Sequence, residues 1–219
     1  MTNQKIGVTK ESARIMLYQL LTLVFYEPTI DLLATLDKEE NLTQLIRASG
    51  VYLGSQSEKL MRDLLAVIPS VDKESFINLK AEYTRLFIGP MTPICPPYES
   101  VFDQSRPDEW KGTMAGPTSD AMAAFLRGEG LDLTLEYAEL PDHVAIELEF
   151  MYYLLSRAYS GEENSAGYLE KANAFLTEHL AKWLPEFGRL LSQKAREPFY
   201  QKVGLLLEAV IIADLDFIS

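Results

Sequence analysis

The sequence predicts an all-α protein that folds as a single domain, residues 1–219, of about nine or ten helices. Apolar residues recur at the three- and four-residue spacing that marks one face of an α-helix. Prolines and glycines separate these stretches, and an alternation of Leu131, Leu133 and Leu135 is too brief to build a sheet. A chain of this length buries roughly 70% of its unfolded surface, enough to fold without disulfides or metal ions.

Five helices are expected before residue 90, because each stretch has apolar residues at helical spacing. Proline and glycine terminate most of them: Pro28 stops the first, Gly50 the third and Pro69 the fourth. The fifth, which carries Phe76 and Phe87, ends at Gly89-Pro90. The expected ranges are 13–25, 30–36, 42–48, 60–68 and 76–87.

The segment 89–117 differs from the rest of the chain, because it contains six of the eleven prolines. Proline lacks the backbone N–H donor and clashes with the preceding turn, so the segment cannot be regular helix or central strand. A loop of this length inside a domain is usually functional or disordered. Its large apolar side chains favour an ordered, docked loop, and these are Tyr98, Val101, Phe102 and Trp110.

Helix is expected again from 117 to 128, with Gly128-Glu129-Gly130 as its C-terminal cap. The segment 131–140 is predicted to be a linker or hinge. A long helix then begins at Pro141, where the fixed φ of proline suits a first turn. Its predicted core stripe is Val144, Leu148, Met151, Leu155 and Ala158.

Three further helices are predicted, over 169–180, 185–195 and 198–216. Pro185 and Pro198 are expected at the first helical position of the last two, which proline favours. No internal repeat is found, so the sequence favours one helical domain.

The charge of the chain points to a basic partner. Lys and Arg number 20 and Asp and Glu 32, for a net charge of −12. This charge repels nucleic acid and anionic membrane surfaces. Between Arg127 and Arg157 there is no Lys or Arg but there are seven acidic residues, a block typical of an interaction surface. The acids of this block are Glu129, Asp132, Glu136, Glu139, Asp142, Glu147 and Glu149.

The sequence indicates a cytoplasmic protein without stable membrane association. The N-terminus lacks an apolar core followed by a small-residue cleavage site, so no signal peptide is expected. The most apolar stretch, 203–213, is too short to span a bilayer. A single cysteine, Cys95, excludes an internal disulfide and suits a reducing compartment.

Catalytic patterns are weak. No phosphate-binding glycine motif is present, and Cys95 has no histidine near it in sequence. The alternative function is a metal-dependent hydrolase that uses Asp142, His143 and Glu147. That group lacks the second histidine of the HExxH motif, whereas catalytic zinc needs three protein ligands. The sequence therefore predicts no metal site and no enzymatic activity.

Three ordered motifs resemble the TorD/DmsD/NarJ family of molybdoenzyme maturation chaperones. The first is EYTRLFIGP at 82–90 followed by PPYESVF at 96–102. The second is PDHV at 141–144 followed by ELEFM at 147–151. The third joins FL and HL, at 175–180, to WLP at 183–185 and PFY at 198–200. The likeness extends over nearly the whole chain.

The resemblance implies a chaperone that binds the N-terminal twin-arginine leader, or the apoenzyme, of a molybdopterin oxidoreductase. It implies that the client is held back from export until its cofactor is inserted. Guanine nucleotide or molybdenum-cofactor binding is implied by the resemblance alone, and no motif for either is present. The hinge at 131–140 makes a monomer or a swapped homodimer the expected state.

The motifs supply candidate groups for both parts of such a leader. Carboxylates suit the two guanidinium groups, and aromatic and apolar side chains suit the stretch that follows. Core packing is the alternative for Leu86, Phe87 and Met151. The acids expected to hold the arginines are Glu99, Asp142 and Glu147. Asp142 and His143 are expected to form a recognition pair at an exposed helix start. The complete predicted client site is Tyr83, Leu86, Phe87, Pro96, Pro97, Tyr98, Glu99, Asp142, His143 and Glu147.

Overall fold

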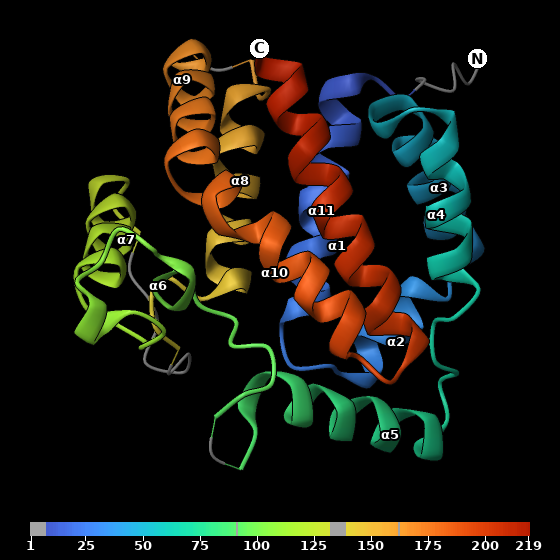
Figure 1. The fold of residues 1–219 in the computed structure, drawn as a ribbon. Coiled ribbons are helices and arrows are strands. Elements are labelled where there is room, and N and C mark those ends of the chain that lie inside the picture. The colour runs from blue at the N-terminus through green and yellow to red at the C-terminus, as the bar shows by residue number, and fades with distance from the viewer. Residues whose placement is uncertain (1–7, 91, 132–138, 162) are drawn as a thin grey trace.

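The computed structural model describes residues 8–90, 92–131, 139–161 and 163–219, and in these residues the fold is all-α, as predicted (Figure 1). Ten α-helices are longer than the four-residue α6, and the described residues contain no strand. The helices are α1 (Lys10–Phe25), α2 (Ile30–Leu36), α3 (Glu39–Leu53), α4 (Ser55–Leu65), α5 (Lys73–Tyr83), α6 (Glu99–Phe102), α7 (Pro117–Gly128), α8 (Val144–Ala158), α9 (Ser165–Phe175), α10 (Ala181–Lys194) and α11 (Pro198–Ile218).

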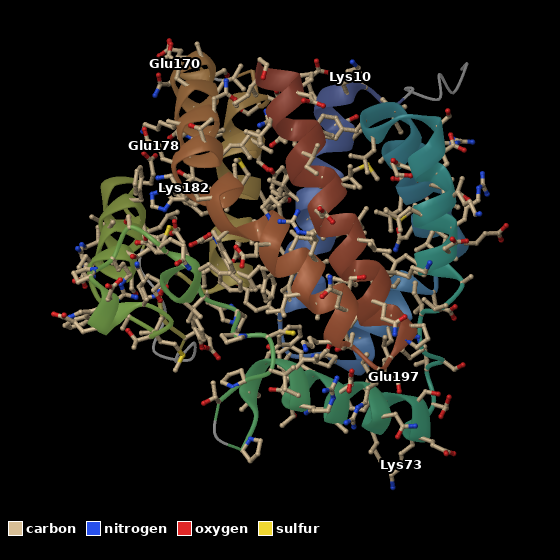
Figure 2. The ribbon with its side chains drawn as sticks, viewed as in Figure 1. Lys10, Lys73, Glu170, Glu178, Lys182 and Glu197 are labelled. Carbon is tan, nitrogen blue, oxygen red and sulfur yellow. The ribbon has the colours of Figure 1, made fainter. Side chains whose placement is uncertain are left out.

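Helix α1 begins at a capping box, in which Thr9 accepts from the Ser12 backbone N–H and Ser12 accepts from that of Thr9. It packs against α8, α3 and α11. The core stripe predicted for α8 is confirmed, since all five of its side chains are buried. Many charged side chains lie on the surface, and Figure 2 shows Lys73, Glu178 and Lys182 directed away from the helices.

Helices α10 and α11 form a hairpin whose close crossing depends on two glycines. A Cβ atom on Gly204 would lie 2.4 Å from the Gly188 carbonyl oxygen, closer than any side chain allows. The hairpin carries Trp183, Phe187 and Tyr200 into the core, where each is at most 1% exposed.

Two helices are extended by wide π-helical turns, η1 (Thr84–Ile88) after α5 and η3 (Leu176–Leu180) after α9. Turns of this kind often mark functional sites. Helix α10 follows η3 without a break, so the prediction that a helix starts at Pro185 is wrong. Pro185 lies inside α10, where its missing N–H would have donated to the carbonyl of Ala181, the residue directly after the wide turn.

Two other predicted helix boundaries are wrong, the end of α3 and the start of α8. Gly50 lies inside α3, because glycine weakens a helix by only about 1 kcal/mol and packing can override it. Helix α8 starts at Val144, with His143 as its N-cap, three residues later than expected. Pro198, by contrast, stands in the first turn of α11 as predicted.

The proline-rich segment is ordered around Arg106. The buried guanidinium donates to the backbone carbonyls of Ser100, Thr113 and Ala115 at 2.7–2.8 Å. In its described residues before α7 the segment holds α6 and the short 3-10 helix η2 (Asp108–Trp110), which agrees with the prediction that it is not regular helix. Trp110 lies over Arg106 but stays half exposed. The expected hinge falls largely on 132–138, outside the described residues.

None of the helices in the described part of the chain has the length and apolar character needed to cross a membrane.

Candidate functional site

The first two sequence motifs lie side by side in the fold. The Val144 N–H donates to the Pro97 carbonyl at 2.8 Å, and the Glu99 N–H donates to the Asp142 carbonyl at 3.0 Å. Tyr98 and His143 form the antiparallel bridge between these bonds. Segments more than 40 residues apart in sequence are therefore joined through their backbones.

Asp142 strengthens this joint from below the surface. Its side chain is fully buried, and Oδ2 accepts from the Ser100 N–H at 2.9 Å. The N–H of Ser100 belongs to the first turn of α6, where no carbonyl of that helix can accept it. Asp142 thus fixes the start of α6 onto the start of α8. The prediction that Asp142 is exposed is wrong, because the proline-rich segment covers it.

His143 is also buried, and it caps its own helix. Its Nδ1 accepts from the Ala145 N–H at 3.2 Å, and its ring meets that of Tyr98 at 5.2 Å in a T-shaped contact. Burial lowers the pKa of His143 to about 4, against the opposing effect of Glu139 and Asp142. The imidazole is therefore neutral at pH 7, and the expected exposed, polar helix start is instead a packed one.

Replacing Asp142 with alanine should lower the free energy of unfolding by about 1–3 kcal/mol, because the buried Ser100 N–H loses its acceptor. Asp142→Asn should lose less, because its amide oxygen can still accept from Ser100. Urea unfolding of the two variants beside the wild type measures the difference. Equal losses would show that the bond to Ser100 is not what Asp142 contributes.

The burial of His143 predicts a pH dependence of stability. The pKa is about 4 in the folded protein and about 6.5 in the unfolded chain, so the unfolded chain binds more protons between these values. Stability should therefore fall as the pH drops from 6.5 to 4. In His143→Asn, which keeps a helix cap, the loss between pH 7 and pH 5 should be smaller by about 1–2 kcal/mol. Urea unfolding of both proteins at the two pH values measures these losses. Equal losses of unfolding free energy in the wild type and the variant would contradict this prediction.

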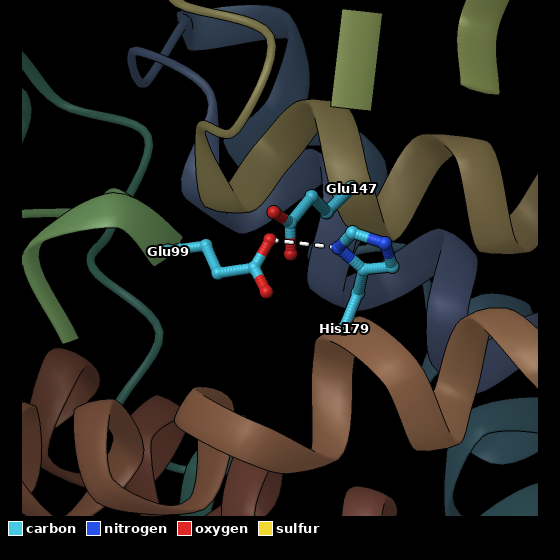
Figure 3. A group of neighbouring side chains, drawn as sticks. All are labelled: Glu99, Glu147 and His179. Atoms are coloured by element: carbon cyan, nitrogen blue, oxygen red, sulfur yellow. Dashed lines mark hydrogen bonds and ion pairs between the residues drawn. The ribbon is translucent and has the colours of Figure 1, made fainter. Parts of the chain in front are cut away.

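Behind the joint lies a buried polar cluster of Glu99, Glu147 and His179 (Figure 3). His179 Nδ1 lies 2.8 Å from Glu99 Oε2, and Trp183 Nε1 donates to Glu147 Oε2 at 2.9 Å. The other oxygen of Glu147, Oε1, has no hydrogen-bond partner. Burial and the neighbouring Glu99 raise the pKa of Glu147 well above its ordinary value. Sequence reasoning missed His179 as a member of this site.

The metal ligands of the alternative function are not brought together. Glu99, Glu147 and His179 are the group of three in the described residues whose donor atoms are close enough to share an ion. Asp142 and His143 do not belong to it, because one bonds to Ser100 and the other caps α8. The proposed set of Asp142, His143 and Glu147 is therefore wrong.

The predicted residues of η1 and its approach lie in the core. Phe87 contacts Tyr83, Phe25 and Tyr200, with ring centroids 5.1–6.0 Å apart, and Leu86 is fully buried. Core packing, the alternative given for Leu86 and Phe87, is therefore the role in which the structure shows both side chains. The Cys95 N–H donates to the Leu86 carbonyl at 2.8 Å, which fixes the proline-rich segment to this core.

Of the predicted site residues, Pro96 and Tyr98 are partly exposed. The Tyr98 hydroxyl donates to Glu139 Oε2 at 2.6 Å, and Glu139 is itself partly exposed. Ile88, the last residue of η1, is 53% exposed, and Ile94 in the proline-rich segment is 40% exposed, so two large apolar side chains face solvent in the stretch of chain before Tyr98. The accessible part of the site is thus the pair of Tyr98 and Glu139, and the buried part holds it in place.

The fold and the joined motifs define the class of this protein as all-α, with two distant segments joined through their backbones. Residues 53–189, which include both joined segments, match the family model described as Nitrate reductase delta subunit. The chain belongs to this family, which includes the TorD and NarJ proteins.

Curated relatives carry the name chaperone protein TorD. The protein of Psychrobacter sp. (strain PRwf-1) is 30% identical over 158 residues, 68% of each chain. That of Shewanella pealeana is 25% identical over 216 residues, 95% of this chain and 91% of the relative. The match to the Vibrio vulnificus (strain CMCP6) protein, at 27% identity, spans just under two thirds of that relative, 66%.

A solved structure shares the fold. It is described as a putative redox enzyme maturation protein from Archaeoglobus fulgidus, with a TM-score of 0.51 and 22% identity, and the match covers 94% of this chain and 96% of that one. The predicted fold class is confirmed by this likeness as well as by the helices themselves.

Proposed function

We propose that the protein is a cytoplasmic chaperone for a molybdopterin oxidoreductase. It binds the N-terminal twin-arginine leader, the apoenzyme or both, supports cofactor insertion and prevents premature export. The observation that carries this proposal is the backbone joint between Pro97–Ser100 and Asp142–Val144, in a chain whose relatives are chaperones. The joint brings together the two motifs that characterise the resemblance and leaves Tyr98 partly exposed against Glu139, just before the second motif.

Arginine recognition is assigned to the accessible acid of this surface. Glu139 is partly exposed and lies in the block without Lys or Arg, so an incoming guanidinium meets no competing cation nearby in sequence. Carboxylates bind guanidinium groups through two parallel hydrogen bonds. The Tyr98 hydroxyl already bonds to Glu139 Oε2 and orients the carboxylate. The buried Glu99, Asp142 and Glu147 support the surface from behind.

The apolar stretch of the leader is assigned to the exposed apolar side chains that precede the joint in the sequence. Ile88 and Ile94 expose about half of their surface, and Pro96 adds a rigid apolar group. Tyr83, Leu86 and Phe87 give these residues a fixed base. A leader with two arginines followed by apolar residues therefore has a carboxylate partner at Glu139 and apolar partners along residues 88–96.

Calorimetry with a synthetic twin-arginine leader tests the proposal. The wild type should bind it with an affinity that falls as salt rises, because screening weakens charge attraction. A leader with both arginines replaced by alanine should bind at least tenfold more weakly. Glu139→Gln should also weaken binding of the intact leader, whereas Glu58→Gln, an exposed acid on α4, should leave it unchanged. Equal affinities for the two leaders would remove arginine recognition from the proposal.

Two further properties belong to the proposal. The protein turns over no substrate, as the chaperone names of its relatives suggest, and it needs neither nucleotide nor molybdenum cofactor in order to fold. It acts as a monomer or a swapped homodimer, which light scattering after size exclusion distinguishes. Nucleotide hydrolysis measured in the presence of the leader tests the first property. Several nucleotides hydrolysed per chain would contradict it.

A further inference from the structure

The cluster behind the joint brings three potential metal ligands from three separate elements to one place. Glu99 comes from α6, Glu147 from α8 and His179 from the π-helical turn η3 (Figure 3). Their donor atoms all lie within 4.8 Å of one another, and His179 Nδ1 is 2.8 Å from Glu99 Oε2. In Figure 3 the two carboxylates and the imidazole point toward a common centre.

Burial makes this arrangement costly without a positive charge. Glu99, Glu147 and His179 are 5%, 0% and 7% exposed, and Glu147 Oε1 has no hydrogen-bond partner. Among the described residues, no lysine or arginine forms an ion pair with either carboxylate. The buried Arg106 instead binds backbone carbonyls. Two buried carboxylates need a compensating charge, which a proton or a metal ion can supply.

We propose that Glu99, Glu147 and His179 bind one divalent transition-metal ion, Zn²⁺ in the first place. One imidazole nitrogen and two carboxylate oxygens are ligands that zinc accepts, whereas calcium and magnesium prefer oxygen ligands alone. The bond from Trp183 to Glu147 Oε2 supplies the outer-shell support that metal-binding carboxylates usually have. The ion clamps α6, and with it the joined surface, to α8 and η3.

This inference departs from the sequence expectation of no metal site. Glu99, Glu147 and His179 are separated by 48 and 32 positions in the sequence, and no spacing rule joins them. The sequence alone does not indicate that His179 lies next to Glu99 or Glu147. The proposal is independent of client binding, because it rests on a cluster that no leader needs to touch.

The first experiment measures stoichiometry on tag-free protein. Chelator-treated protein is dialysed against Zn²⁺, and the zinc bound per chain is measured by inductively coupled plasma mass spectrometry. We expect one zinc ion per chain in the wild type and in Glu149→Gln, an exposed acid on the same helix. Glu147→Gln should bind at least tenfold more weakly, although its amide oxygen still accepts from Trp183 and its N–H can donate toward Glu99. Because it mimics a protonated glutamic acid, its metal-free melting temperature should stay close to that of the wild type.

Trp183 gives a second readout at the site itself. The chain has two tryptophans, so in Trp110→Phe the fluorescence comes from Trp183 alone. Zn²⁺ should change that fluorescence saturably, and Co²⁺ should add visible absorption bands at the same stoichiometry. Zinc at about a hundredfold excess over its Kd should raise the melting temperature by about 5–10 °C.

His179→Gln provides a second variant, and it should lose both the fluorescence change and the thermal shift. Unchanged fluorescence and melting in the wild type on addition of zinc would overturn the proposal, and so would equal zinc content in wild type and Glu147→Gln. Either result would assign the cluster to a shared proton between Glu99 and Glu147.

Discussion

Replacing Asp214 with alanine should lower the free energy of unfolding by about 3–5 kcal/mol, because it leaves a buried arginine without its counter-ion. Arg14 and Asp214 have no exposed side-chain surface. Arg14 Nη2 donates to Asp214 Oδ2 at 2.9 Å, and the Tyr18 hydroxyl donates to the same oxygen at 2.6 Å. Tyr52 donates to Oδ1. One carboxylate therefore joins α1, α3 and α11.

Arg189→Ala is the matched control for this substitution. Arg189 also pairs with an acid across two helices, at 2.8 Å from Glu208, but its side chain is 53% exposed. Exposed pairs contribute less than about 1 kcal/mol because water screens them. Chemical unfolding of both variants gives the comparison. Similar losses for Asp214→Ala and Arg189→Ala would show that burial of the first pair has no energetic consequence.

Replacing Leu148 with alanine should cost about 2–5 kcal/mol, because it removes buried methyl groups and leaves a cavity. Leu148 is fully buried on the core stripe of α8, next to Glu147. Leu205 on α11 is 38% exposed, so Leu205→Ala should cost much less. Leader affinity per folded molecule should be unchanged in both variants. A loss of affinity in folded Leu148→Ala would mean that the core stripe itself belongs to the client site.

The helices and the core of this fold could be predicted from the sequence because local periodicity specifies them. The stripe of α8 illustrates this, since the spacing of Val144, Leu148 and Met151 alone places them on one buried face. Pro185 illustrates the limit. Proline usually begins a helix, but here a wide turn precedes it and the chain continues without a break. Nothing in the local sequence announces a π-helical turn.

The site was harder to predict because its members are joined by tertiary contacts. Asp142 and His143 were expected on an exposed helix start, as charged and polar residues usually are. The proline-rich segment covers both through backbone bonds from Val144 to Pro97 and from Glu99 to Asp142, and Asp142 Oδ2 accepts from Ser100 there. Acidity in the sequence was therefore a poor guide to exposure. Among the described acids of that block, Glu139 and Glu149 are accessible to solvent and accept from the hydroxyls of Tyr98 and Tyr26.

The central claim, that this protein matures a molybdopterin oxidoreductase, is tested most directly by the cofactor content of a client. A molybdopterin oxidoreductase precursor with its twin-arginine leader is expressed in cells without this chaperone, with the wild type, or with Glu139→Gln. The client is then purified and its molybdenum per chain is measured. We predict a several-fold higher molybdenum content with the wild type than without it, and an intermediate content with Glu139→Gln. The same molybdenum content in all three preparations would contradict the account.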